Sequence, residues 1–398
     1  MQRVIFGLIS IFLLSIMFSC SGAAMGRNKD FRQPPALYNM NHLNELREKG
    51  AEDTEVKLFI KQADDILDES PVTIMDRKKT FAPNAHYYCS ISRYSWPSDN
   101  NPNVYVIKDG LLNPEFGDFN RPNLDKLANC QKTLSVAYYI TEDEKYYNAF
   151  CKQLDAWFLA KSTYMKPTME YAQVVQGHNN NKGMEHGLVD LNQFTPVIES
   201  ILLIKQIKDI ETSLEQGIIA WFSSMLDWAL KDKRWERLKQ TPNNIVSSLY
   251  VCFLEMARYI GRIDIAEILA NEYTEYVIDA QIDEEGKQPA ELSRVAGFGY
   301  SVSNLVSVVD FCLVMEQAGI HYYRKNQRKI DSAFSYLLQY VGNEEAFPYT
   351  QNGNWGEYEN RLERNVTRLS RLSAKRSKVK RKGASMDLSK ESVLNYVY

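Results

Sequence analysis

Apolar residues recur every three or four positions over much of the chain, which is the spacing of one buried helix face. Leu127, Leu134, Ala137 and Tyr138 show this spacing within one segment. The pattern predicts helices over 41–67, 123–140, 143–160, 188–207, 213–231, 243–260, 262–280, 300–318 and 322–341. Alternating apolar and polar positions, typical of a strand, occur only in short stretches such as 104–107.

The predicted helices have similar lengths and follow one another roughly in pairs. This arrangement predicts an all-α fold built from helical hairpins, as an array or a toroid. Because no sequence repeat is evident, the periodicity does not establish that the hairpins form a ring. Unusual polar and aromatic residues gather in the connecting loops, where sites on helical scaffolds are expected: 84–97, 166–187, 241–248 and 286–300.

The first residues have the composition of an export signal. Residues 1–20 combine a positive start at Arg3 with an apolar run too short to span a membrane comfortably, and they end at Cys20. A Cys after a small residue at this place resembles a bacterial lipoprotein cleavage site, so lipidation of Cys20 is predicted, with plain secretion as the alternative. Residues 21–40 are polar and predict a tether. The expected location is the periplasm or the outer membrane, held by a lipid anchor alone.

Charge separates the body of the chain from its end. The predicted helical body spans 41–360, and the tail spans 361–398. Between Arg361 and Gly383 there are ten Lys or Arg residues and one acid, although the whole chain of 398 residues carries a net charge of −3. The tail is expected to be solvated and disordered, with contact to an anionic surface as the alternative. The acidic remainder argues against nucleic acid as a partner.

Cysteine spacing gives no sign of a metal or cofactor site. Beyond Cys20 the chain has five widely spaced cysteines, without a Cys-x-x-Cys pair or a His-rich cluster. With 44% apolar residues the chain is expected to be globular. The sequence therefore carries no metal-binding or redox signature, and no metal site is expected.

The first unusual loop, 84–97, is rich in aromatic residues. Arg93, Tyr94 and Trp96 suit a groove for acidic sugars, because aromatic faces carry sugar rings and Arg pairs with carboxylates. An aromatic mini-core explains the same residues equally well.

Two further loops place polar residues near turns and helix starts. Gln173, His178 and His186 lie in a Gly-punctuated stretch that is either an ordinary loop or part of a site. Asn243 and Asn244 precede a predicted helix. One Asn is a common helix cap, and two in succession leave one side chain able to donate into a pocket.

The fourth loop carries the residues best suited to chemistry. Arg294 is a permanent planar cation, and Tyr300 follows Gly297-Phe298-Gly299 at the start of a predicted helix. A guanidinium beside a phenol can hold a carboxylate and move a proton near it. A capping Arg with a buried Tyr is the alternative.

Taken in order, these motifs resemble the alginate-lyase domain of the helical polysaccharide lyases, notably families five and thirty-eight. They are the Tyr-x-Trp-Pro of 94–97, the Met-x-Pro-x-x-x-Tyr-Ala-Gln of 165–173, Asn-Asn at 243–244, and the Gln-Pro-x-Glu-Leu-x-Arg of 288–294 followed by Tyr300. The resemblance covers about residues 80–350. It implies an incomplete α/α toroid that cleaves a uronic-acid polymer by cofactor-free β-elimination.

The resemblance also implies roles for individual residues. Tyr300 and Arg294 match the catalytic Tyr and Arg of the family, and Asn244 matches the Asn that helps to neutralise the substrate carboxylate. Substrate-groove positions are matched by Arg93, Tyr94, Trp96 and Gln173, with Asn243, His178 and His186 as further candidates for substrate binding. The chain departs from the family pattern twice, since Ile245 and Gly299 stand where the family usually has His.

Elimination requires that the carboxylate next to the acidic C5 proton be neutralised, so that negative charge can spread as the proton leaves. A base takes this proton and an acid protonates O4. One Tyr can do both only if the two groups lie on the same ring face, as in mannuronate and glucuronate but not in guluronate. Two alternatives remain at this stage. One is a glycoside hydrolase using two of Asp190, Glu170, Glu185 and Glu291, and the other is a non-catalytic glycan-binding lipoprotein.

Overall fold

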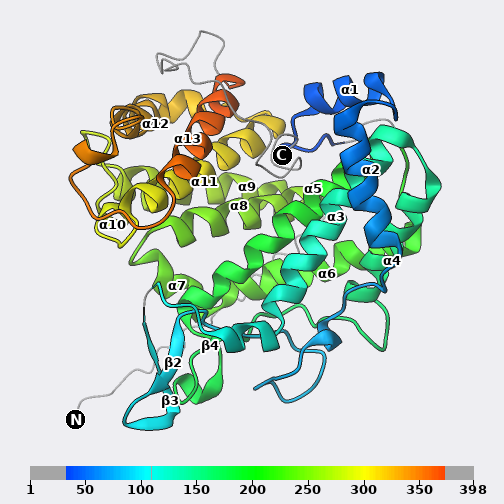
Figure 1. Cartoon of the computed structure of the whole chain (residues 1–398), viewed down its shortest axis with the longest axis horizontal. Helices are drawn as coiled ribbons and strands as arrows, with labels where there is room; N and C mark the ends of the chain where they lie inside the picture. Colours follow the sequence, from blue (N-terminus) through cyan, green and yellow to red (C-terminus); the bar gives the residue numbers. More distant parts are fainter. Residues whose placement is uncertain (1–32, 109, 373–398) are drawn as a thin grey trace, which may run out of the picture. The chain divides into compact units, whose positions relative to one another are not determined.

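A computed structural model describes residues 33–108 and 110–372, which form a mostly helical body (Figure 1). Thirteen α-helices occur in these residues: α1 Met40–Lys49, α2 Thr54–Leu67, α3 Arg121–Thr141, α4 Glu144–Phe158, α5 Phe194–Ile204, α6 Thr212–Lys231, α7 Lys233–Lys239, α8 Asn244–Tyr259, α9 Ile263–Tyr273, α10 Pro289–Leu292, α11 Gly297–Gln317, α12 Tyr322–Leu338 and α13 Trp355–Ser370.

The long helices form two layers. Helices α3, α5, α8 and α11 pack side by side in one row, and α4, α6, α9 and α12 lie against them on the outside. Helices α1 and α2 extend one end of the row beside α3, and α13 covers α11 at the other end (Figure 1). No comparable packing between α3 and α11 closes the row within the described residues. The predicted fold class, an all-α incomplete toroid of helical hairpins, is confirmed.

Most predicted helices are present, and the differences have local causes. The range 41–67 is two helices, because α1 ends at Gly50, whose φ of 74° leaves the helical region, and Asp53 caps α2. The range 188–207 begins as the 3₁₀ segment η4, Glu185–Gln193, before α5. The end of 262–280 is the π-helical segment η5, Thr274–Asp279. The pattern missed α7 and α10, which are too short to show a period, and α13.

Short strands occur in the loops that were expected to carry the site. β1 (Cys89–Ile91) pairs in parallel with β4 (Tyr171–Val174). β2 (Ser95–Ser98) and β3 (Asn101–Ile107) form an antiparallel hairpin, which contains the alternating stretch 104–107. The two aromatic loops of the sequence are therefore joined by backbone pairing, although residues 92–170 separate them along the chain.

The core consists of the apolar faces of the two helical layers. Aromatic rings of three helices meet in its centre, where Phe158, Phe194, Trp221 and Phe222 are all within 6.1 Å of a neighbouring ring centroid. Two described helical stretches, Glu185–Ile204 and Gly297–Gln317, are long and apolar enough to cross a membrane. Both are mostly buried inside the protein, as core helices of this composition are.

The segment before α1 is packed against the body, so the predicted tether of 21–40 is wrong from residue 33 onward. Glu199 on α5 accepts hydrogen bonds from the backbone N–H groups of Ala36 (3.0 Å) and Leu37 (2.6 Å). Arg258 on α8 pairs with Glu199 at 2.6 Å and with Glu255 at 2.8 Å. Because both carboxylates are fully buried, these contacts fasten the segment to the inner row of helices.

This buried cluster predicts a pH-dependent stability. Burial raises the pKa of Glu255 to about 8, with Arg258 opposing the shift and Glu199 adding to it. Between the ordinary value of 4.5 and about 8, the folded chain keeps a proton that the unfolded chain has lost. The free energy of unfolding should therefore decrease as pH rises through this window, by up to about 1.4 kcal/mol per pH unit.

We expect Glu255→Gln to flatten this dependence, because the amide stays neutral at every pH and can still donate to Glu199. Denaturant unfolding between pH 5 and pH 8 measures the effect. Glu267→Gln, at an exposed position of α9, is the matched control and should keep the wild-type slope. An unchanged slope in Glu255→Gln would contradict the assignment.

The C-terminal boundary predicted at residue 360 is also wrong, because it cuts α13. Leu362, Val366 and Leu369 are buried against the body, and α13 packs along α11. Residues 361–370 are thus part of the folded domain and not of a disordered tail. Residues 373–398 of the predicted tail, the signal peptide and the lipidation site Cys20 lie outside the described residues and stay predictions.

Candidate active site

The Arg and Tyr singled out in the sequence lie against each other at the start of α11. The guanidinium carbon of Arg294 is 4.2 Å from the centroid of the Tyr300 ring, which is a cation–π contact. Both side chains are partly exposed. Because the short helix α10 ends at Leu292, the chain turns immediately before Arg294 and brings it back over the first turn of α11. The predicted juxtaposition is confirmed.

Asn244 is joined to the same segment by a buried carboxylate. Glu291 on α10 accepts a hydrogen bond from the backbone N–H of Asn244 (2.6 Å) and another from its Nδ2 (2.7 Å). Glu291 is 1% exposed, and burial raises its pKa, while Asn244 and Arg294 act against the shift. One N–H of the Asn244 amide is thus committed to Glu291, and the second can be offered to a ligand. Asn243 is the N-cap of α8, with Oδ1 accepting from the backbone N–H of Ile245 at 2.9 Å.

The first turn of α11 is held by a distant part of the chain. Gln351 Oε1 accepts from the backbone N–H groups of Phe298 (2.9 Å) and Gly299 (3.1 Å), which have no intrahelical partner. Trp355 stacks on Phe298 with ring centroids 4.1 Å apart. These contacts fix the helix end that presents Tyr300. Local sequence patterns do not predict these contacts, because Gln351 lies 53 positions beyond Phe298 in the chain.

Ile245 and Gly299, where the resemblance leads one to expect His, have other surroundings. Ile245 is partly buried and packs against the core. A Cβ at Gly299 would lie 2.5 Å from Cζ of Tyr358, a residue of α13. A phenol from α13 therefore occupies the space that a side chain at position 299 would need.

Gln173 belongs to a buried network around Asp190 of η4. The carboxylate is fully buried and accepts four hydrogen bonds, from Tyr88 OH (2.9 Å), Ser90 Oγ (2.7 Å), Arg121 Nη1 (2.6 Å) and Gln173 Nε2 (2.8 Å). Gln173 also has a φ of 51°, a strained value for a residue with a side chain. Its backbone is held there by a hydrogen bond to Ser90 Oγ at 2.7 Å.

The two loop histidines differ in their surroundings. His178 is exposed, and its Nε2 lies 2.9 Å from the carbonyl oxygen of Tyr105 on β3, which ties this loop to the hairpin. His186 Nε2 is buried without a hydrogen-bond partner in the described structure. Burial lowers the pKa of His186, with Asp190 and Glu185 opposing the shift. Burial therefore favours the neutral form of the His186 imidazole, and its Nε2 has no hydrogen-bond partner in the described structure.

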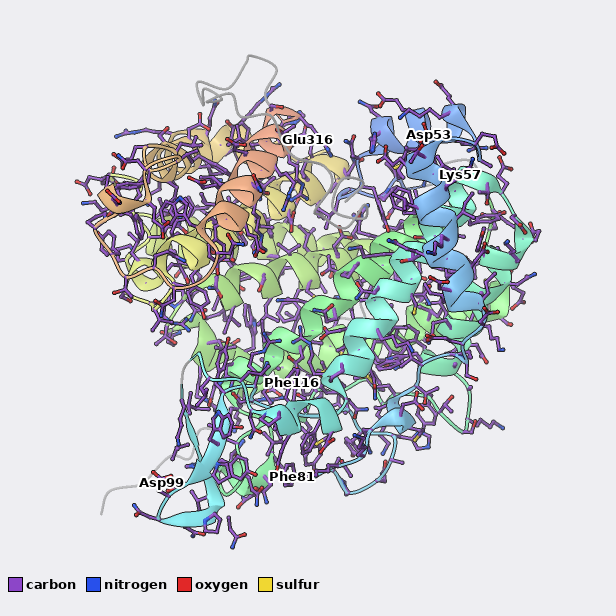
Figure 2. The ribbon with its side chains drawn as sticks, viewed as in Figure 1. Asp53, Lys57, Phe81, Asp99, Phe116 and Glu316 are labelled. Atoms are coloured by element: carbon purple, nitrogen blue, oxygen red, sulfur yellow. The ribbon has the colours of Figure 1, made fainter. Side chains whose placement is uncertain are left out.

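The remaining candidates lie on or beside the β2–β3 hairpin, whose tip carries Asp99 (Figure 2). Arg93 lies over the ring of Phe116 at 5.2 Å, and Trp96 Nε1 donates to the carbonyl oxygen of Leu111 at 2.7 Å. Tyr94 accepts from the backbone N–H of Lys108 through its carbonyl group. Local contacts therefore order all three residues, and their contact with a sugar stays a prediction.

Side-chain contacts join the candidate residues into two groups, and a helix packing contact connects the groups. The first group is Arg294, Tyr300 and Asn244 around Glu291, and the second is Gln173 and His186 around Asp190, linked through β1, β4 and the hairpin to Arg93, Tyr94, Trp96 and His178. The segment η4 packs against α8, where Asn192 donates to Ser248 at 2.7 Å, one turn beyond Asn244. Glu291 and Gln351 are the partners that the sequence interpretation missed.

The four carboxylates considered for a hydrolase all form hydrogen bonds or ion pairs within the protein. Asp190 and Glu291 are buried and hydrogen bonded as described above, whereas Glu170 and Glu185 each form an ion pair with a Lys or an Arg, at 2.7 Å. A glycoside hydrolase needs one carboxylic acid and one carboxylate facing the same bond. The arrangement does not favour that alternative.

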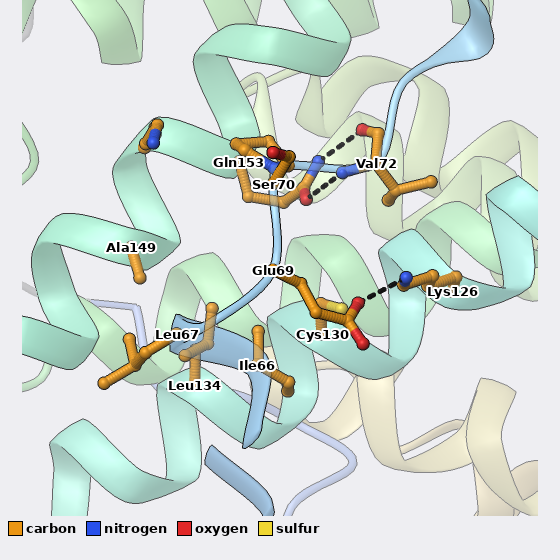
Figure 3. A pocket seen from close by; sticks show the side chains of 12 residues that line it. Ile66, Leu67, Glu69, Ser70, Val72, Lys126, Cys130, Leu134, Ala149 and Gln153 are labelled. Atoms are coloured by element: carbon orange, nitrogen blue, oxygen red, sulfur yellow. Dashed lines mark hydrogen bonds and ion pairs between the residues drawn. The ribbon is translucent and has the colours of Figure 1, made fainter. Parts of the chain in front are cut away.

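A cavity lies elsewhere in the fold. It has a volume of about 70 Å³ and is formed between α2, α3 and α4, with the Lys126–Glu69 ion pair at its edge (Figure 3). Gln153 spans its other side by two hydrogen bonds to the backbone of Val72. None of the candidate residues lines it. Among the described residues, no group of three or more His, Cys, Asp or Glu is placed to hold a metal ion.

Comparison with known proteins agrees with this geometry. A family model described as alginate lyase matches residues 72–347. A solved alginate lyase from Bacteroides ovatus has 29% sequence identity and a TM-score of 0.79, over 86% of this chain and 92% of that chain. No curated protein matches the chain.

More distant structures share the fold alone. Alginate lyase A1-III from Sphingomonas species A1 has 15% identity and a TM-score of 0.50, over 80% of this chain and 82% of that chain. A variant of alginate lyase A1-III in complex with a tetrasaccharide has 14% identity and a TM-score of 0.53, over 82% and 83%. Since the family model spans more than half of the sequence, the chain belongs to the alginate lyase family and is a polysaccharide lyase on a helical toroid.

Proposed function

We propose that the protein cleaves a uronic-acid polymer of the mannuronate or glucuronate type by β-elimination, with Tyr300, Arg294 and Asn244 as catalytic residues. The observation that carries the proposal is the contact of Arg294 with the Tyr300 ring at the start of α11, together with the hydrogen bonds by which Glu291 holds Asn244. The named relatives support the choice of substrate class, because the Bacteroides ovatus structure is that of an alginate lyase.

Arg294 and Asn244 supply the charge stabilisation that the reaction needs. Loss of the C5 proton places negative charge on the substrate carboxylate, and preorganised donors at that place lower the barrier. The planar Arg fork suits a carboxylate, and the second N–H of the Asn244 amide can add to it. Glu291 keeps that amide oriented through its two hydrogen bonds.

Tyr300 then serves as base and acid in turn. A cation beside a phenol favours the phenolate, which removes the C5 proton and returns it to O4 as the bond to the leaving sugar breaks. A single residue can reach both atoms only on one ring face. Mannuronate and glucuronate meet this condition, whereas guluronate does not.

His186 provides a second route. Its buried Nε2 has no partner in the described structure, and burial favours the neutral imidazole that can act as a base. If His186 takes the proton on the face opposite to Tyr300, guluronate linkages become cleavable as well. The proposal keeps Tyr300 as the single base and makes the participation of His186 an outcome of the test.

A screen of uronate polymers tests the function. Elimination leaves an unsaturated sugar that absorbs in the ultraviolet, while hydrolysis gives reducing ends without this absorbance. We expect absorbance to rise with mannuronate-rich or glucuronate polymers and not with guluronate-rich polymer.

Preferred cleavage of guluronate that His186→Ala abolishes would replace the single-Tyr route by the two-residue route. Absence of turnover on every polymer would refute the proposed function, and saccharide binding without turnover would favour a glycan-binding protein. His321→Ala is the matched control, because His321 precedes α12 at the opposite end of α11 from Tyr300, and it should behave as the wild type.

A further inference from the structure

Helix α13 runs parallel to α11 and begins beside Tyr300. Trp355 stacks on Phe298, Arg361 Nη1 donates to Ser303 Oγ at 3.1 Å, and Arg368 pairs with Asp310 at 2.5 Å. Successive contacts thus step along both helices in the same direction. In Figure 1, α13 rises from its orange first turn, near α10 and α11, to its red end. Its first turns therefore cover the helix end that carries the candidate catalytic residue.

Tyr358 is wedged onto this end. A Cβ at Gly299 would lie 2.5 Å from Cζ of Tyr358, and one at Gly353 would lie 2.8 Å from its hydroxyl oxygen. The Tyr358 side chain therefore lies so close to Gly299 and Gly353 that neither position has room for a side chain. Tyr358 remains partly exposed. An aromatic surface is thus placed directly next to Tyr300 in the first turn of α11.

Arg361 lies one turn further along α13, near Arg364, Arg368 and the carboxylate of Asp310. Burial lowers the pKa of Arg361, and Arg364 and Arg368 lower it further, while Asp310 opposes them. Asp310 is itself paired with Arg368. In the described structure, the hydrogen-bond acceptor of Arg361 is a neutral hydroxyl group, that of Ser303. Arg361 is partly buried, and a cation that has lost part of its water is stabilised when an anion pairs with it.

The position of Arg361, which is hydrogen bonded to Ser303, suits a sugar unit next to the one at Tyr300. Ser303 follows Tyr300 by three residues, which is roughly 4.5 Å along the helix axis. This offset is comparable to the length of one sugar unit in a polymer. Tyr358 and Arg361 also lie beyond residues 72–347, the range that the family model matches.

We propose that Tyr358 and Arg361 form a further substrate subsite, in which Arg361 binds the carboxylate of the uronate unit next to the one that is cleaved. The Tyr358 ring carries the face of that sugar, and the guanidinium fork pairs with its carboxylate. The subsite rests on the proposed function, because its ligand is the same anionic polymer. It makes α13, and not only the loops of the toroid, a wall of the substrate groove.

Kinetics of Arg361→Gln on a polymer that the wild type cleaves test the subsite. We expect KM to rise about tenfold or more, as for a lost hydrogen bond to a charged group, with kcat nearly unchanged. Arg361→Lys should recover part of the loss, and Tyr358→Leu should also raise KM. Arg371→Gln, at an exposed position near the end of the same helix, is the matched control and should behave as wild type.

Binding measured apart from turnover separates this proposal from the proposed function. Calorimetric titration of the Tyr300→Phe variant with a uronate oligosaccharide gives a Kd, which Arg361→Gln in the same background should raise by a similar factor. If the wild type cleaves no uronate polymer but this Kd still depends on Arg361, the reaction is wrong and the subsite stands. An unchanged KM and Kd in folded Arg361→Gln and Tyr358→Leu would overturn the subsite. If Arg361→Gln does not fold, the same comparison rests on Arg361→Lys and Tyr358→Leu.

Discussion

Tyr300→Phe is expected to remove nearly all turnover of the polymer while leaving the fold and polymer binding almost intact. The variant keeps the ring that lies under Arg294, at 4.2 Å from the guanidinium carbon, and loses only the hydroxyl group. Proton transfer by a positioned side chain contributes roughly 10²–10⁴-fold to the rate. Since Tyr300 is proposed to act as both base and acid, the loss should lie toward the upper end of that range.

Initial rates of ultraviolet absorbance measure this effect, and calorimetric binding of a uronate oligosaccharide checks that the groove is intact. Tyr349→Phe is the matched control, because its phenol is exposed in the loop before α13 and should be dispensable. Retention of more than about a tenth of the wild-type rate by Tyr300→Phe would show that another group moves the proton. His186 would then be the next residue to replace.

Asp190→Ala is expected to lower the free energy of unfolding by about 3–5 kcal/mol, the usual cost of breaking one side of a buried ion pair. The substitution leaves Arg121 without its 2.6 Å partner and removes the acceptor of the Gln173 amide. Gln173 is held at a φ of 51°, so loss of this partner should also loosen the connection between β1 and β4.

Denaturant unfolding measures this change. Glu185→Ala is the matched control, because the Glu185–Arg237 ion pair lies in the same segment but is partly exposed, and it should cost less than about 1 kcal/mol. Asp190→Asn keeps the size and some acceptors of the side chain, and should fall between the two. Equal stability of Asp190→Ala and Glu185→Ala would mean that the network does not support the fold as described.

The Asp190 network also changes how Gln173 is understood. The sequence placed Gln173 among residues that contact the substrate, whereas its side-chain amide is engaged with Asp190. Its second N–H and its carbonyl oxygen are the groups with which Gln173 would bind a sugar hydroxyl. The structural role alone is sufficient to explain the strained backbone at this position.

The local sequence pattern was sufficient to predict the features that depend on residues close together in the chain. The helices predicted over 123–140, 143–160 and 213–231 appear within a few residues of these limits, because an apolar stripe at helical spacing is buried wherever the helix packs. The contact of Arg294 with Tyr300 is of the same kind, since only six positions separate them and the turn between α10 and α11 fixes their approach.

Other features were decided by contacts between segments far apart in the chain. Asn244 meets Glu291 across 47 positions, and Phe298 meets Gln351 across 53, so neither pairing leaves a trace in local spacing. The high charge of 361–370 predicted a solvated tail, although its apolar stripe of Leu362, Val366 and Leu369 lies buried in the fold. A polar helix of this kind becomes stable only when another helix covers its one apolar face, and that partner, α11, is supplied by the tertiary structure.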